Sequence, residues 1–172
     1  MNLLPQTYLL GLVGLLAIVA VVVGRQFFRV RRDEARLIEL EKSDTALSRQ
    51  ASDLYELGSV QLRKRLYPQA AATLKQALKR LSGEPDEARA LIENALGFAL
   101  AAQKDYSGAT KHYKLALKAK ADYPIALNNL AFAQEKLLKD AEAISLYEQT
   151  LSLEPKNATA KKGLKKLQRR MS

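Results

Sequence analysis

The chain has 172 residues, a formal charge of +10, no cysteine and no tryptophan, and its single histidine is His112. These counts exclude disulfide frameworks, thiolate nucleophiles, iron–sulfur clusters and cysteine-based zinc sites. One imidazole rarely holds a metal by itself, and no glycine-rich phosphate loop or paired acids mark a cleft. The sequence therefore predicts a protein that is not an enzyme and that has no cofactor or metal. We expect His112, in the segment KHYK, to be a solvated surface residue.

An apolar segment opens the chain, and residues 2–24 carry no ionisable side chain. As a helix, residues 3–23 extend roughly 31 Å, which matches a hydrocarbon core of roughly 30 Å. A cleaved signal peptide is the alternative, but it expects basic residues before a shorter apolar core. Here the basic residues follow the segment: Arg25, Arg29, Arg31 and Arg32. We therefore expect residues 1–24 to be a retained, single-pass transmembrane anchor.

The same arginines predict the topology of the protein. By the positive-inside rule, everything after Arg25 lies on the cytoplasmic or equivalent side of the membrane. Residues 25–50 are expected to form a basic juxtamembrane segment and a helical stalk. Its leucines have near-heptad spacing, but Asp44 interrupts the seam, so a plain stalk is preferred to a coiled coil.

The remainder of the chain is predicted to be helical. Only seven valines occur, five of them between Val13 and Val23, whereas good helix formers dominate later. Three copies of one spacing follow, in which a small residue precedes an alanine by 12 positions. These small residues and alanines are expected at helix crossings: Gly58 with Ala70, Gly97 with Ala109, and Ala131 with Ala143. The spacing, with Gly97 and Ala131 lying 34 residues apart, is typical of the tetratricopeptide repeat.

The predicted fold class is all-α: an N-terminal transmembrane helix, then an α-solenoid of three tetratricopeptide repeats with a C-terminal capping helix. Five residues are inserted near 81–89, because Gly58 and Gly97 lie 39 residues apart. The expected boundaries are 51–89 for repeat 1 with its insertion, 90–123 for repeat 2, 124–157 for repeat 3 and 158–172 for the basic amphipathic cap.

The positive charge is concentrated at the two ends of this architecture. Residues 156–172 contain seven Lys and Arg and no acid, whereas residues 37–155 contain 16 of each sign. A neutral repeat body argues against nucleic acid as a partner. The basic cap is interpreted as a solubilising end of the solenoid, with contact to anionic lipid headgroups or an acidic partner as the alternative.

The first helix of each repeat faces the concave groove, which is the predicted site for a protein partner. Asn94, Asn128 and Asn129 carry amide donors and acceptors suited to an extended peptide backbone, and Phe98 and Phe132 supply apolar pockets. In the alternative interpretation, the asparagines bond to neighbouring repeats and the phenylalanines are core. Binding of chaperone tails is disfavoured, since Tyr55 and Ser59 stand where a carboxylate clamp expects a basic residue and an asparagine.

The whole chain resembles one family in particular. The anchor, followed by RRDEARLIELEK, ALIENALGFALAAQKDY, YPIALNNLAFAQEKL and LEPKNATAKKGLKKL, is similar to the photosystem I assembly proteins of cyanobacteria and plastids. The resemblance implies a thylakoid membrane protein whose repeats face the cytoplasm or stroma. It also implies that the partners are photosystem I subunits or assembly factors. Composition and spacing by themselves indicate only a membrane-tethered binding scaffold. A protein-import receptor and a general bacterial inner-membrane assembly scaffold therefore remain as alternatives.

Overall fold

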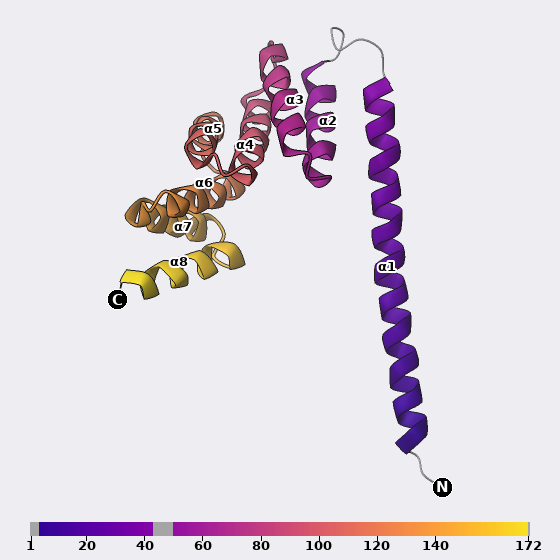
Figure 1. The fold of residues 1–172 in the computed structure, drawn as a ribbon. Coiled ribbons are helices and arrows are strands. Elements are labelled where there is room, and N and C mark those ends of the chain that lie inside the picture. The colour runs from indigo at the N-terminus through magenta and orange to yellow at the C-terminus, as the bar shows by residue number, and fades with distance from the viewer. Residues whose placement is uncertain (1–3, 43–49, 172) are drawn as a thin grey trace. The chain divides into compact units, whose positions relative to one another are not determined.

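The computed structural model describes residues 4–42 and 50–171, and the chain divides into two compact units, Met1–Ser43 and Asp44–Ser172 (Figure 1). The described residues form helices joined by short turns and loops, without a strand. The predicted all-α class is therefore confirmed. The helices, in chain order, are α1 (Leu4–Lys42), α2 (Ala51–Arg63), α3 (Tyr67–Arg80), α4 (Asp86–Ala102), α5 (Tyr106–Ala119), α6 (Pro124–Lys136), α7 (Asp140–Leu153) and α8 (Ala158–Met171).

Helix α1 is a candidate membrane span. Its stretch Tyr8–Glu39 is long and apolar enough to cross a bilayer, and its apolar side chains are exposed. An apolar helix that buries none of its surface against protein is stable where lipid covers it. The helix runs without a break from the predicted anchor into the predicted stalk, up to Lys42. Residues 43–49 of that stalk, with Asp44, lie outside the described residues.

In the second unit, each helix packs on the next, and alternate helices form one layer. Helices α2, α4, α6 and α8 contact one another in succession, in addition to the contacts between consecutive helices. Among the described residues, α3, α5 and α7 make no such contacts with each other. The closely spaced layer is the inner, concave side of a curved stack, and the separated layer is its outer side.

Small residues allow the paired helices to approach closely. A Cβ placed on Gly97 of α4 would lie 2.6 Å from Cε1 of Tyr113 on α5, and a Cβ on Gly58 would lie 2.7 Å from Cγ of Leu74. The four alanines predicted at these crossings are fully buried: Ala70, Ala109, Ala131 and Ala143. Larger side chains would therefore not fit at these crossings, and the sequence has glycine or alanine there.

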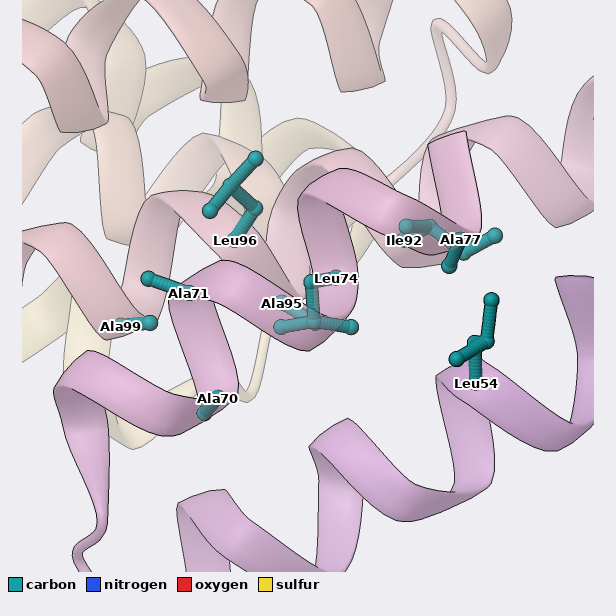
Figure 2. Close-up of a cluster of buried hydrophobic side chains, with 9 residues drawn as sticks. All are labelled: Leu54, Ala70, Ala71, Leu74, Ala77, Ile92, Ala95, Leu96 and Ala99. Carbon is teal, nitrogen blue, oxygen red and sulfur yellow. The ribbon is translucent and has the colours of Figure 1, made fainter. Parts of the chain in front are cut away.

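The largest cluster of buried apolar side chains joins the first two helix pairs (Figure 2). It is built from α2, α3 and α4, and its members are Leu54, Ala70, Ala71, Leu74, Ala77, Ile92, Ala95, Leu96 and Ala99. Alanines dominate it, so the helices approach at short interaxial distance while a few leucines fill the remaining space.

The turns repeat as regularly as the helices do. Arg65, Lys104 and Leu138 have positive φ values of 60°, 67° and 61°, each in the turn between the first and second helix of a pair.

The inserted residues extend α4, which has 17 residues against 13 in α6. Consequently α4 begins at Asp86, ahead of the predicted start of repeat 2 at residue 90. Asp86 and Glu87 lie in its first turn, where negative charge interacts favourably with the helix dipole and stabilises the helix.

Candidate protein-interaction groove

Two asparagines link the first helices of repeats 2 and 3. The Nδ2 of Asn129 on α6 donates to Oδ1 of Asn94 on α4 at 3.0 Å. In turn, Nδ2 of Asn94 donates to the hydroxyl of Tyr123 at 3.3 Å. Burial raises the pKa of Tyr123, as does nearby Tyr55, whereas the bond from Asn94 lowers it. The phenol is therefore neutral at physiological pH and accepts this bond.

A second amide contact links α6 to the capping helix. The Nδ2 of Asn128, a buried residue, donates to Oδ1 of Asn157 at 3.2 Å. The same Oδ1 accepts from the backbone N–H of Ala160 at 3.0 Å and so caps α8. Each of the three predicted groove asparagines thus bonds to a neighbouring repeat or to the cap of α8, as the alternative interpretation describes.

The phenylalanines lie differently. Phe98 follows Asn94 by one helical turn and is 45% exposed, and Phe132 follows Asn128 by one turn and is 44% exposed. Leu91 and Ile125 stand seven residues before them, on the same faces of α4 and α6, and are 42% and 59% exposed. We call these four side chains the groove patch: Leu91, Phe98, Ile125 and Phe132.

Neighbouring side chains hold one ring of the groove patch in place. The ring of Tyr106 on α5 meets that of Phe132 edge-on, with centroids 6.3 Å apart. The Nζ of Lys136 lies 5.3 Å from the centroid of Phe132. An ammonium over a ring face and an edge-to-face aromatic pair both restrict the ring. Phe132 is thus fixed in orientation while nearly half of its surface faces solvent.

The prediction for His112 is wrong. Its Nδ1 lies 2.7 Å from Oε2 of Glu93, and the two side chains are 18% and 6% exposed. Glu93 stands on α4 where the other repeats have Leu54 and Leu127, both buried. An acidic residue at a buried repeat position needs a hydrogen-bonding partner. The substitution of leucine by glutamate at this position is visible in the sequence and could have indicated such a partner. His112 on α5 supplies it.

Within the described residues, basic side chains cluster on α1 and on α8. On α1, Arg25, Arg29 and Arg32 line a hollow of about 460 Å³ beside Phe28. The guanidinium of Arg31 lies 5.1 Å from the centroid of the Phe27 ring. The second cluster is on α8. Among the residues that the structure describes, no group of three or more His, Cys, Asp or Glu side chains could hold a metal ion.

Three helix pairs with small residues at their crossings, closed by a further helix, define a tetratricopeptide-repeat protein. Solved structures share this fold: the first such domain of Spaghetti (RPAP3) bound to an HSP90 peptide has a TM-score of 0.66 and 24% identity, covering 71% of this chain and 93% of that one. The Cut9–Hcn1 hetero-tetramer gives a TM-score of 0.74 at 20% identity, covering 84% of this chain and 28% of that one. No family model matches the chain.

Relatives with similar sequences cover most of the chain. It is 32% identical over 155 residues to the chloroplastic tetratricopeptide repeat domain-containing protein PYG7 of Arabidopsis thaliana, covering 90% of this chain but only 51% of the relative. The ycf37 proteins of Guillardia theta and Cyanophora paradoxa are 29% and 36% identical over 92% and 65% of this chain. The match spans 89% and 64% of those two proteins. The chain is a homologue of these proteins.

Proposed function

We propose that the protein is a membrane-anchored scaffold that binds photosystem I subunits or assembly factors and assists the assembly or stabilisation of photosystem I. A tetratricopeptide-repeat protein is a scaffold for protein interaction, and the relatives include a chloroplastic protein. The observation that carries the proposal is the groove patch. Its two aliphatic and two aromatic side chains recur at the same places in repeats 2 and 3, exposed and on adjacent first helices.

The groove patch has the character of a binding surface. Exposed apolar side chains of this kind resemble the centre of a protein interface, where apolar anchors carry most of the energy and polar groups set direction. The bond between Asn94 and Asn129 holds the two first helices at one spacing, so the patch is formed before a partner arrives. A primary amide has two N–H donors and two acceptor sites, so Asn94 and Asn129, which are partly exposed, keep capacity for a partner's backbone, whereas Asn128 is buried.

The proposed location is the thylakoid membrane, with a single span and with the repeats on the cytoplasmic or stromal side. It is supported by the apolar α1, by the arginines that follow the apolar stretch, and by the chloroplastic relative. Protease added to that side of intact membranes should remove the repeat domain. Cleavage only from the opposite side would show that the Arg25–Arg32 cluster does not determine the orientation.

The groove is tested with the variant Phe98→Ala/Phe132→Ala. In a phototrophic host this variant should lower the amount of photosystem I relative to photosystem II, because it removes the two aromatic anchors. Low-temperature fluorescence measures the ratio. The phenylalanines are better targets than the asparagines, since Asn94 and Asn129 also tie the repeats together.

A matched control removes similar apolar surface from the outer helices. In Leu115→Ala/Leu153→Ala, the substituted side chains are 36% and 41% exposed and lie on α5 and α7. The photosystem ratio should stay at the wild-type value in this control. A normal ratio in the groove variant, with the protein present at wild-type level, would contradict the proposal.

A further inference from the structure

The capping helix α8 presents a continuous basic face. Lys161, Lys162 and Lys165 are exposed and, within the described part of the chain, make no ion pair. Five cationic side chains surround a surface hollow of about 550 Å³: Lys162, Lys165, Lys166, Arg169 and Arg170. The sequence from 155 to 172 contains no acid, so no carboxylate of this segment neutralises these cations.

The opposite face of α8 is already occupied by protein. Ala160 and Leu167 are fully buried in a cluster with Tyr147 of α7 and Ala131 of α6. Gly163 lies against the Tyr147 ring, where a Cβ would collide with it. The helix therefore cannot insert its apolar stripe into a bilayer without leaving the solenoid. Any contact with a membrane must be made by its charged face, at the level of the headgroups.

Ion pairs at one edge fix the direction of that face. Lys166 binds the buried carboxylate of Glu135 on α6, and Arg170 binds Asp140 on α7. Burial, together with the charge of Glu135, raises the pKa of Tyr147 to about 12, so the ring against which α8 packs stays neutral. The three unpaired lysines thus extend outward from a helix that is anchored along its other sides.

We propose that Lys161, Lys162 and Lys165 dock the end of the solenoid on the anionic headgroup surface of the membrane that α1 spans. Exposed cations without an exposed apolar centre suit adsorption to a charged lipid surface better than a protein interface, which needs such a centre. The candidate span belongs to the same chain, so the lipid surface is present at high effective concentration. This contact is a second attachment to the membrane, independent of what the groove binds.

The test uses the full chain in vesicles and exploits its lack of cysteine. A fluorophore on Gln168→Cys reports from α8, and one on Ser107→Cys reports from α5, both exposed positions. The vesicles contain a headgroup quencher in phosphatidylcholine alone, or in a mixture with about one third phosphatidylglycerol. The α8 reporter should be quenched more strongly in the anionic vesicles, and high salt should remove the difference. The α5 reporter should respond less than the α8 reporter.

Charge variants separate this site from a general effect of net charge. Each cation near an anionic surface contributes roughly five-fold in binding, so Lys161→Gln/Lys162→Gln/Lys165→Gln should weaken the docked state roughly 100-fold. The variant's quenching should fall to the phosphatidylcholine level while its helical circular dichroism is retained. Lys75→Gln/Lys79→Gln/Lys114→Gln removes the same charge from exposed positions on α3 and α5 and should behave as wild type. Equal quenching of the α8 reporter in both vesicles, or equal loss in both variants, would overturn the proposal. The first result would leave an acidic protein partner as the alternative occupant of the basic face.

Discussion

Substituting His112 by alanine should lower the free energy of unfolding by about 3 kcal/mol, because it leaves the carboxylate of Glu93 buried without its partner. The carboxylate is 6% exposed and lies 2.7 Å from the imidazole Nδ1. Thermal unfolding of the detergent-solubilised chain, followed by circular dichroism, measures the change.

Repeat 3 supplies the matched control. It has Leu127 and Leu146 where repeat 2 has Glu93 and His112. Since a buried hydrogen-bonded pair replaced by apolar residues of similar shape is often neutral or stabilising, Glu93→Leu/His112→Leu should be at least as stable as wild type. If the double variant is as unstable as His112→Ala, lost packing rather than an unpartnered carboxyl group is the cause.

Gly97→Leu should lower the free energy of unfolding by about 1–3 kcal/mol, because the added side chain overpacks a helix crossing. Even a Cβ on Gly97 would lie 2.6 Å from the buried ring of Tyr113, so α4 and α5 must separate at their crossing. The melting temperature measures this cost. Ala102→Leu, an exposed position on the same helix, adds a similar bulk to solvent and should leave it unchanged. Equal melting temperatures for the two variants would contradict the assigned crossing.

The fold could be predicted because its constraint is local and repeated. A residue without bulk is needed wherever two helices cross closely, and the pairs at Gly97/Ala109 and Ala131/Ala143 show that need at fixed spacing. The extra turn of α4 is harder to predict from the sequence. Pro85 marks a helix boundary, but the sequence does not say that residues 86–89 join the second pair.

The side chains of the groove depend on geometry between repeats, which helical periodicity does not supply. Periodicity places Asn94 and Phe98 on one face of a helix, one turn apart. The bond from Asn129 to Asn94 depends on how closely α4 and α6 approach, and the exposure of Phe98 depends on the curvature of the stack. For His112, its lysine neighbours in sequence suggested solvent, whereas its position in the repeat placed it beside Glu93.

Co-purification from solubilised thylakoid membranes tests the central proposal most directly. Photosystem I subunits should be recovered with the wild-type chain and with Leu115→Ala/Leu153→Ala. They should be lost from Phe98→Ala/Phe132→Ala, although that variant keeps its helical content and its place in the membrane. Recovery of photosystem I subunits at the wild-type level with the folded groove variant would contradict the account.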